Sequence, residues 1–312
     1  ILLESNTKNK HYLDNVFFLS KSIKDTGKNV YLISFDTEIF HEKEKAIKLE
    51  SHSKFPVEIF LAKTENNHIH IPKGDIAIDF LVINNDQSAP ISLDWSSIKT
   101  KMSPSPEMGW YKRQKIKHFE AYQKIISEFC KEFKGNENLL QAKFKSVHHV
   151  DFSTKDGLEE LANQVDSLKS CITEDQKVFI KASKGTYGMG IHVVTNGEEV
   201  LQLNRKKRNK LDIGKNKIKF TDVLIQEGVE TIISYDGMPA EVTIYLIGGQ
   251  SVGGFMRANT IKDSNENLNS KGMVFKKFCI SEIRQNRDDV MKEAVYSTIG
   301  RLSCLASILE HE

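Results

Sequence analysis

Two apolar, strand-like runs enclose a glycine-spaced loop at residues 179–194, and this feature restricts the possible folds more than any other. The run "FIKA" leads into "SKGTYGMG", which returns directly into a second apolar run, "IHVV". The GxxxxGK[ST] spacing of a Walker loop is absent, and a dinucleotide fingerprint would continue into a helix instead of a strand. The stretch therefore predicts a flap between two antiparallel strands.

The loop has the chemistry of a phosphate cradle. Gly185, Gly188 and Gly190 let backbone N–H groups approach an anion closely and adopt positive φ. Lys181, near the end of the first strand, would add an ammonium beside that anion. The alternative is a plain glycine hairpin with no ligand.

The first part of the chain predicts a parallel sheet. "ILLE" is a short apolar strand, residues 7–27 have apolar side chains at helical spacing, and "NVYLISFD" is a second strand. Strand, helix and strand in this order form a βαβ unit. The chain begins with Ile inside an apparent strand, which predicts that the native start precedes it.

A polar cluster, "INNDQSA", follows another buried strand at residues 79–82. Open α/β sheets bind ligands in the crevice outside the carboxyl ends of their strands. We therefore expect the cluster to hold the amino and carboxylate groups of a zwitterionic substrate, with an Asn/Asp-rich turn as the alternative. The candidate substrate-binding residues are Asn84, Asn85, Asp86 and Ser88.

Composition excludes several functional classes. The 312 residues carry a net charge of +2, so no overall basic field indicates a nucleic-acid partner. No apolar stretch approaches the ~20 residues that cross a membrane, so we expect no membrane partner. The four cysteines form no CxxC pair, which favours buried thiols in the cytoplasm. The sequence does not indicate an oligomeric state.

Three features downstream of the flap add to a phosphate-site hypothesis. "VLIQEGVE" is a strand that ends in Gln226 and Glu227, and "GGFMRANT" ends a strand with Arg257, a cation that can grip a phosphoryl group. "SNENLNSKGM" then crowds oxygen ligands that suit Mg²⁺. Its candidate metal ligands are Glu266, Asn267 and Asn269, with Glu241 on the preceding strand as a rival.

The chain resembles the glutamate–cysteine ligases of the third, ATP-grasp-like type. The motifs that carry the resemblance are "KASKGTYGMGI", "LNRKKRNK", "IQEGV", "VGGFMR" and "ENLNSKGM", with "ILLESNTKNKHYLDNV", "INNDQSA" and "GWYKRQKIKHF" in the first half. Departures occur where the family has Ala-Asp-Ala before Gly-Thr-Tyr and two arginines after Gly-Trp. This chain has Ala182-Ser183-Lys184 and Lys112-Arg113 at those places.

The resemblance implies an enzyme that joins the γ-carboxylate of glutamate to the amine of cysteine through an acyl phosphate, with ATP and Mg²⁺. It implies catalytic roles for Lys181 and Arg257, and a substrate carboxylate held by Arg113. The implied nucleotide-binding residues are Lys181, Lys184, Gly185, Thr186, Tyr187, Gly188, Met189, Gly190, Gln226, Glu227 and Val229.

The implied fold class is α/β. An N-terminal parallel-sheet domain of the pre-ATP-grasp kind, residues 1–145, would precede an ATP-grasp-like α+β domain, residues 146–312, with the boundary in the polar stretch 134–150. Two alternatives stay open. One is a ligase for a different amino-acid pair, and the other is a non-catalytic nucleotide-binding regulator that has kept the fold.

Overall fold

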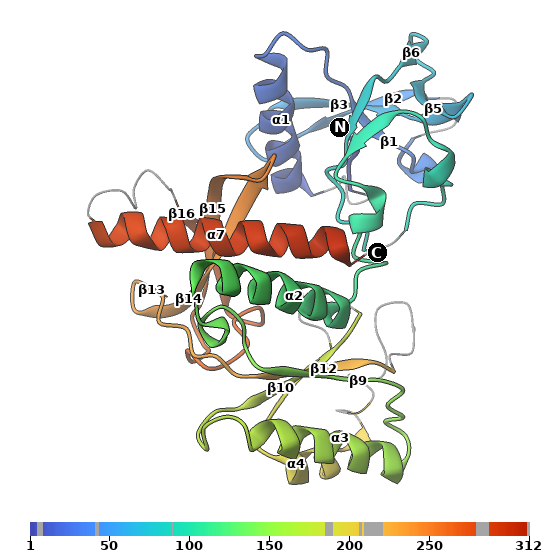
Figure 1. The fold of residues 1–312 in the computed structure, drawn as a ribbon. Coiled ribbons are helices and arrows are strands. Elements are labelled where there is room, and N and C mark those ends of the chain that lie inside the picture. The colour runs from blue at the N-terminus through green and yellow to red at the C-terminus, as the bar shows by residue number, and fades with distance from the viewer. Residues whose placement is uncertain are drawn as a thin grey trace. The chain divides into compact units, whose positions relative to one another are not determined.

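The chain forms two compact units of mixed α and β structure, residues Ile1–Lys112 and Arg113–Glu312 (Figure 1). This computed structural model describes residues 1–4, 9–40, 44–88, 90–184, 190–205, 208, 221–278 and 287–310. We expected the boundary near residue 145. The units divide earlier because helix α2 (Lys115–Phe133) packs on helix α7 (Arg287–Leu309) of the second unit.

The first unit contains the predicted parallel strands. Strand β1 (Leu32–Ser34) pairs parallel with β3 (Pro56–Leu61), and β7 (Phe80–Val82) pairs parallel with β8 (Lys101–Ser103). Leu2 forms parallel bridges to both Ile33 and Ile83 and so joins the two pairs. Strand β2 (Ala46–Glu50) adds antiparallel to β3. The carboxyl ends of the N-terminal segment, β1 and β7 therefore share one edge.

Helix α1 (Lys10–Lys24) is the predicted crossover between the first two parallel segments. The side chain of Asn9 caps its N-terminus by accepting from the N–H groups of His11 and Tyr12. Leu13 and Val16 are buried in a core with Ile1, Leu3, Leu32, Val57 and Ile59. The remaining strands of the unit are β4 (Lys63–Glu65), β5 (His68–Ile71) and β6 (Ile76–Ala77), which form a small antiparallel sheet. Its short 3₁₀ helices are η1 (Thr37–Ile39), η2 (Trp95–Ser97) and η3 (Pro106–Met108).

The second unit begins with α2 and an antiparallel sheet in the order β11-β10-β12-β9. These strands are β9 (Phe144–Val147), β10 (Val178–Ala182), β11 (Ile191–Val194) and β12 (Val223–Glu227). Helices α3 (Lys155–Lys169) and α4 (Gly197–Leu201) lie on one side of this sheet (Figure 1). Their apolar side chains and the inward residues of the strands form its core, so the opposite face can carry polar groups. A 3₁₀ turn, η4 (Glu137–Leu139), precedes β9.

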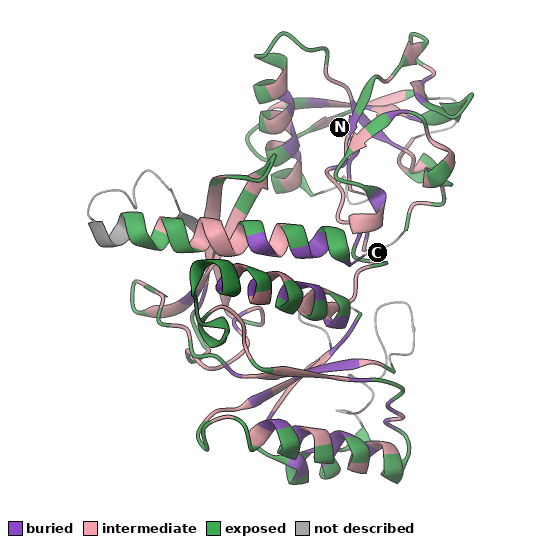
Figure 2. Ribbon diagram, in the orientation of Figure 1, coloured by how far each residue is buried: buried purple, intermediate pink, exposed green. Residues whose placement is uncertain are grey.

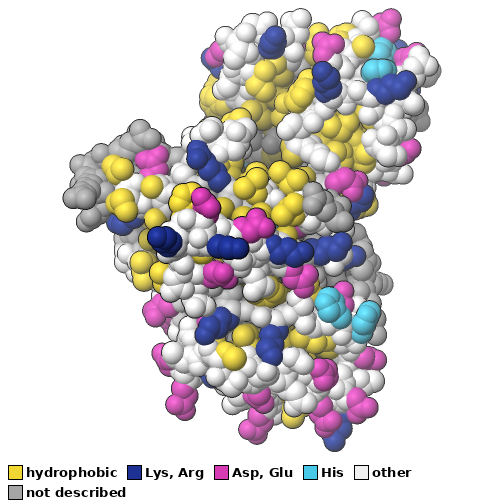
Figure 3. Space-filling view, in the orientation of Figure 1, with side chains coloured by type: hydrophobic (Ala, Val, Ile, Leu, Met, Phe, Trp, Pro, Cys, Tyr) yellow, Lys and Arg dark blue, Asp and Glu magenta, His cyan; other side chains and the backbone are white. Residues whose placement is uncertain are grey.

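A second antiparallel sheet has the order β13-β14-β15-β16. Its strands are β13 (Ser234–Tyr235), β14 (Met238–Ile247), β15 (Gln250–Asn259) and β16 (Met273–Phe278). Helix α7 packs on β14 and β15 and runs beside α2. Its apolar stripe is only partly buried: Leu302 is 7% exposed, but Val295 and Leu305 are about half exposed (Figure 2). On the face drawn in Figure 3, side chains of both charge signs are interspersed.

Candidate functional site

Lys181 lies on the face of the first sheet that is opposite to the α3–α4 core. Its Nζ donates to Gln226 Oε1 at 2.6 Å and lies 5.5 Å from the centre of the Phe179 ring. These three side chains share one face because side chains alternate along a strand. Burial lowers the pKa of the Lys181 ammonium to about 8, although the charge of Glu241 opposes that shift. The lysine is therefore held in an environment that favours a counter-anion.

A second partly buried lysine, which the sequence does not indicate for this site, lies near Lys181. Lys115 begins α2, and its Nζ donates to the carbonyl of Ala182 at 3.0 Å. Burial and the charge of Lys181 lower the pKa of Lys115 to about 8. Two neighbouring ammonium groups with lowered pKa values are suited to an anion that can neutralise both. The local signal is the basic run "KRQKIK", of which only Arg113 is predicted to hold a substrate carboxylate.

The glycine flap begins and ends as the sequence predicts. Strands β10 and β11 pair antiparallel, and Lys181 lies opposite Ile191. Gly190 has φ +68° and its carbonyl accepts from the N–H of Ala182 at 2.8 Å. Lys184 is exposed at the start of the flap. The predicted residues Gly185, Thr186, Tyr187, Gly188 and Met189 lie outside the described residues, so their contacts stay predictions.

Gln226 and Glu227, the predicted nucleoside-binding residues at the end of β12, point to opposite faces of the sheet. Gln226 faces Lys181, whereas the carboxylate of Glu227 accepts from the backbone N–H of Lys143 at 2.7 Å. Adjacent residues of a strand point to opposite faces, so the two side chains cannot line one surface together. Val229 follows the strand and is 63% exposed. A nucleoside role for Glu227 would therefore have to involve its backbone.

Arg257 and Glu241 form an ion pair across β14 and β15. The two residues are direct partners in the register, and Arg257 Nε donates to Glu241 Oε1 at 2.5 Å. Glu241 also raises the pKa of Lys181, so its carboxylate lies close to that ammonium. The predicted catalytic residues Lys181 and Arg257 thus approach a shared carboxylate from two different sheets of the second unit.

Two of the three predicted metal ligands in the 260–272 loop, Glu266 and Asn267, bond to groups of the loop itself. Glu266 accepts from Lys262 Nζ at 2.9 Å and from the N–H of Asp263 at 3.0 Å, and its pKa is lowered by these bonds. Asn267 Oδ1 accepts from the N–H of Asn269 at 3.1 Å. Both oxygens of Glu266 and the side-chain oxygen of Asn267 therefore already accept hydrogen bonds within the loop. Among the described residues, the His, Asp and Glu side chains that do converge are Glu65, His70 and Asp75, in the first unit.

A buried asparagine that the sequence reading missed holds this loop. Asn259 is 1% exposed, and its amide nitrogen donates to the carbonyls of Leu268 and Lys271. Its Oδ1 accepts from the N–H groups of Ile261 and Lys262. All four bonds reach backbone groups of the loop, so one side chain sets the conformation of the segment that follows Arg257. Its position two residues after Arg257 was the available signal.

In the first unit, the predicted substrate residues form a tight turn at the carboxyl edge of the parallel strands. Asn85 donates to the carbonyl of Leu3 at 2.9 Å and accepts from the N–H of Gln87 at 2.7 Å. Asp86 Oδ1 accepts from the N–H and the hydroxyl of Ser88. Asn84 lies 3.4 Å from the Tyr12 hydroxyl. The structure therefore brings the four residues together, but it uses the Asn85 amide to build the turn.

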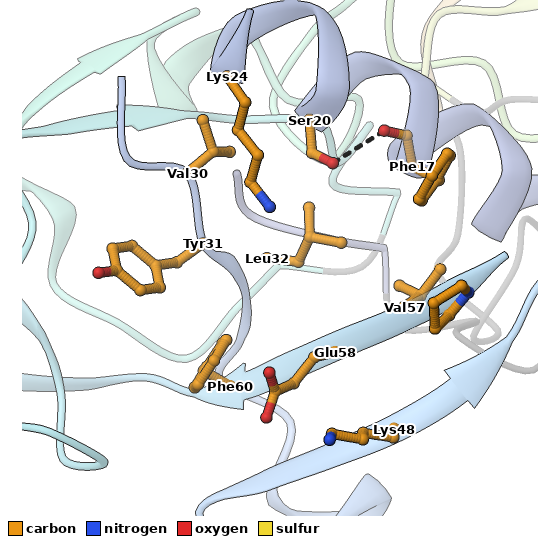
Figure 4. Close-up of a pocket in the computed structure, with 11 residues that line it drawn as sticks. Phe17, Ser20, Lys24, Val30, Tyr31, Leu32, Lys48, Val57, Glu58 and Phe60 are labelled. Carbon is orange, nitrogen blue, oxygen red and sulfur yellow. Dashed lines mark hydrogen bonds between the residues drawn. The ribbon is translucent and has the colours of Figure 1, made fainter. Parts of the chain in front are cut away.

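A separate cavity of about 430 Å³ lies between α1 and the sheet of the same unit (Figure 4). Lys24 and Lys48 stand at its rim, and Glu58, which pairs with Lys73, lies between them. No predicted site residue lines it. Leu32, Val57 and Phe60 give it an apolar wall.

Comparison with known proteins identifies the chain. The family model for glutamate-cysteine ligase, GshA, matches residues 1–311. The chain belongs to the glutamate-cysteine ligase family. This result confirms the resemblance drawn from the sequence motifs and the enzyme class that it implied. No curated protein matches the chain.

Two solved structures resemble this ligase. A protein from Methylobacillus flagellatus KT, described as a γ-glutamylcysteine synthetase, has 29% identity and a TM-score of 0.83, over 99% of this chain and 75% of that chain. D-alanyl-alanine synthetase A from Vibrio cholerae O1 biovar eltor str. N16961 has 11% identity and a TM-score of 0.47, over 96% of this chain and 77% of that chain. Within the described part of the ligase, no helix is both long enough and apolar enough to cross a membrane.

Arg113 of the ligase, predicted to grip a substrate carboxylate, holds a protein carboxylate in this structure. Its Nε and Nη2 donate to the two oxygens of Glu310 at 3.0 and 2.7 Å. His118 Nδ1 lies 2.5 Å from the same carboxylate, whose side chain is 1% exposed. Although burial acts in the opposite direction, the bonds from His118 and Arg113 lower the pKa of Glu310 to about 2. The cluster ties the start of α2 to the end of α7.

The Glu310→Gln variant should lower the free energy of unfolding at pH 7 by on the order of 3 kcal/mol. A carboxyl group whose pKa is lowered on folding stabilises the protein fully above its unfolded pKa and loses that effect as the pH falls. The difference from the wild type should therefore shrink between about pH 4.5 and pH 2. Chemical denaturation of the full chain at several pH values measures it. Glu159→Gln, which removes an exposed partner of Lys155, should change stability by less than about 0.5 kcal/mol. A pH-independent loss in Glu310→Gln would contradict the prediction.

Proposed function

We propose that this ligase phosphorylates the γ-carboxylate of L-glutamate with ATP and then joins it to L-cysteine. In the first step a carboxylate oxygen attacks the γ-phosphorus, and ADP leaves. In the second step the neutral cysteine amine attacks the acyl carbon, phosphate leaves with the bonding electrons, and the amine loses its extra proton to solvent. The observation that supports this most strongly is the pair of partly buried lysines, Lys115 and Lys181, of which Lys181 lies close to Glu241 of the Arg257–Glu241 pair.

The chain's own groups would act by positioning and by charge neutralisation. Lys181 and Lys115 would hold phosphate oxygens, together with backbone amides of the 185–190 flap. Gln226 would lie next to the nucleotide, because its Oε1 already accepts from Lys181. Arg257 would stabilise the negative charge that develops on the transferring phosphoryl group. No nucleophile on the protein is required.

We propose that the fold is of the ATP-grasp-like kind. The two antiparallel sheets of the second unit would hold the nucleotide, and the parallel-stranded first unit would supply an amino-acid site. The sheet orders β11-β10-β12-β9 and β13-β14-β15-β16, with a flap between β10 and β11, support this arrangement.

We expect this ligase to use magnesium because the metal shields phosphate charge in phosphoryl transfer. The fit is poor for two of the predicted ligands, since Glu266 and Asn267 direct their oxygens to groups of their own loop. Glu241 and Asn269 are the ligands that we retain. We also propose a reducing, cytoplasmic compartment, in keeping with the free thiols of Cys130, Cys171 and Cys304.

A screen of amino-acid pairs for ATP-dependent phosphate release tests the proposed reaction. ADP and phosphate should form with glutamate plus cysteine, and much less with either alone. Turnover with another pair only would favour a ligase of different specificity. ATP binding without turnover for any pair would favour a regulatory protein that has kept the fold. The two alternatives are therefore separated by one experiment.

ATP binding should take up protons above about pH 8. Both lysines have a pKa of about 8 without ligand, and a bound phosphate would favour their charged forms and raise both values. Near pH 8.5 the free protein would hold fewer protons on these lysines than the complex. Calorimetry of ATP binding in two buffers of different ionisation enthalpy measures the uptake. Lys115→Met should reduce it, whereas Lys155→Met, on the exposed face of α3, should not. Equal heats in both buffers at pH 8.5 would refute it.

A further inference from the structure

The 84–88 turn lies at the carboxyl edge of the parallel strands of the first unit, at the point where the order in which the strands are connected reverses. The chain runs from the N-terminal segment across α1 to β1 on one side, and later returns through β7 to the other side. Leu2 is bridged to both neighbours, so the residues after Leu2 and after Ile83 emerge together. Such switch points are where open α/β sheets form ligand crevices.

Two carboxylate-bearing residues meet at this point. Glu4 Oε1 accepts from the backbone N–H of Asp86 at 2.5 Å. Tyr12 lies close to this pair, and its hydroxyl accepts from the backbone N–H of Glu4 at 2.8 Å. Burial raises the pKa of Tyr12, and the charges of Glu4 and Asp86 add to that rise. Two half-buried carboxylates whose charges both act on the same tyrosine favour a cation bound near them.

Gln87, between Asp86 and Ser88, gives an independent indication of a ligand. Gln87 is 1% exposed, has φ +49°, and its side-chain oxygen is buried without a hydrogen-bond donor. A buried acceptor without a donor costs free energy, and strained backbone is concentrated at functional sites. Gly109 makes room for Gln87, because a Cβ at Gly109 would lie 2.8 Å from the Gln87 Cβ.

The supporting loops hold these groups in place. The N–H of Trp110 donates to the carbonyl of Asp86 at 2.9 Å, and the N–H of Tyr111 donates to the carbonyl of Gln87 at 3.1 Å. The 84–88 turn is thus fixed by backbone bonds from the 109–111 segment as well as by Asn85. The acceptors do not have to be ordered when a ligand binds, which reduces the entropic cost of binding.

We infer that Glu4, Asp86 and Gln87 form the subsite for the α-ammonium group of the glutamate substrate. An ammonium group has three N–H donors and needs acceptors, which these side chains supply. The choice of glutamate over cysteine as the substrate bound here rests on the proposed function. The cysteine amine must be neutral to attack the acyl phosphate, and an anionic subsite would keep it protonated. The glutamate ammonium takes no part in bond formation, so it suits this subsite.

Glutarate, which is glutamate without its amino group, tests the inference directly. In the wild type, glutarate should bind at least about 10-fold more weakly than glutamate, as expected for losing a charge-assisted hydrogen bond. In Glu4→Gln the affinity for glutamate should fall by roughly 10- to 100-fold and that for glutarate should change little. Gln keeps an oxygen that can accept from the N–H of Asp86, so the turn is preserved.

Two measurements on the full chain separate failure of this inference from failure of the proposed reaction. Calorimetry of glutamate and glutarate binding, with a non-hydrolysable ATP analogue present, does not require turnover. Steady-state kinetics then give KM for glutamate, cysteine and ATP in Glu4→Gln and in Gln87→Leu, and the inference expects only the glutamate KM to rise. The control is Glu58→Gln, which removes a carboxylate at the cavity of Figure 4.

Three outcomes would overturn the subsite. The first is an unchanged preference for glutamate over glutarate in Glu4→Gln. The second is a rise in the cysteine KM instead of the glutamate KM. The third is a loss of glutamate affinity in Glu58→Gln alone, which would move the ammonium site to the other cavity. Glutamate binding that depends on Glu4 without any turnover would support the subsite and count against the proposed reaction.

Discussion

Replacing Lys181 with alanine should lower kcat/KM for ATP by roughly 10³-fold or more while the protein stays folded. The ammonium of Lys181 is buried on the face of β10 opposite the core, and its pKa is lowered to about 8. Burial of this charge is unfavourable in the free protein, so its removal should not lower the free energy of unfolding. The loss should therefore appear in nucleotide binding and turnover and not in stability.

The behaviour of Lys115 gives a second readout for the same variant. The charge of Lys181 contributes to the lowered pKa of Lys115, so this pKa should rise in Lys181→Ala. Reactivity of Lys115 toward an amine-labelling reagent, followed by mass spectrometry across pH 7–10, measures the change. Lys155→Ala serves as a control, since that lysine pairs only at the surface with Glu159. Wild-type ATP affinity and turnover in Lys181→Ala would remove the residue from the mechanism.

Some elements of both units could be predicted from sequence because their signals are local. Apolar runs on both sides of a glycine loop identify β10 and β11, and the apolar spacing within residues 7–27 identifies α1. The stretch 101–109 is a counter-example, because its prolines and glycine predict a loop whereas Lys101–Ser103 forms β8. Its sequence, "KMS", is not apolar, and it becomes a strand because it pairs with β7. Tertiary pairing of this kind has no local signature.

Which residues lie together could be predicted where a residue's position on a strand determines its neighbours, and could not be predicted where side-chain bonding decides. Arg257 at the end of a strand faces Glu241 because the hairpin register places them opposite each other. In contrast, Glu266 was expected to bind a metal, but its oxygens accept from Lys262 and Asp263. Acidic and amide side chains in turns commonly bond to nearby backbone groups, and spacing alone does not distinguish this use from metal binding.

The proximity of Lys115 to Lys181 is a further feature that could not be predicted from the sequence. The two residues are far apart in the sequence, and they meet because the N-terminus of α2 bonds to the end of β10. The N–H of Lys115 donates to the carbonyl of Ser183 at 2.8 Å. No pattern near either lysine predicts that contact. The basic run around Lys115 could indicate only an anion of unknown identity.

Arg257→Lys should lower kcat by about 10²-fold or more, on the order of 3 kcal/mol, with a smaller change in the dissociation constant for ATP. In the structure Arg257 uses Nε to bond to Glu241. A guanidinium has four further N–H donors in a fixed plane, so one side chain can hold Glu241 and a phosphoryl group together. A lysine has a single nitrogen and cannot place donors on both partners with the same geometry.

Arg257 is expected to act on charge that develops during phosphoryl transfer, so ATP binding and turnover should respond differently to its replacement. A group that acts mainly in the transition state contributes little to the ground-state affinity for ATP. Stopped-flow measurement of ADP formation and equilibrium binding of ATP to the same variant separate the two effects. Arg301→Lys is a matched control, because Arg301 is exposed on α7 and bonds to Gln250 at 2.5 Å. Equal losses in ATP affinity and in kcat/KM, with kcat unchanged, would assign Arg257 to nucleotide binding alone. Full activity in both Arg257→Lys and Arg257→Ala would leave it as a structural partner of Glu241.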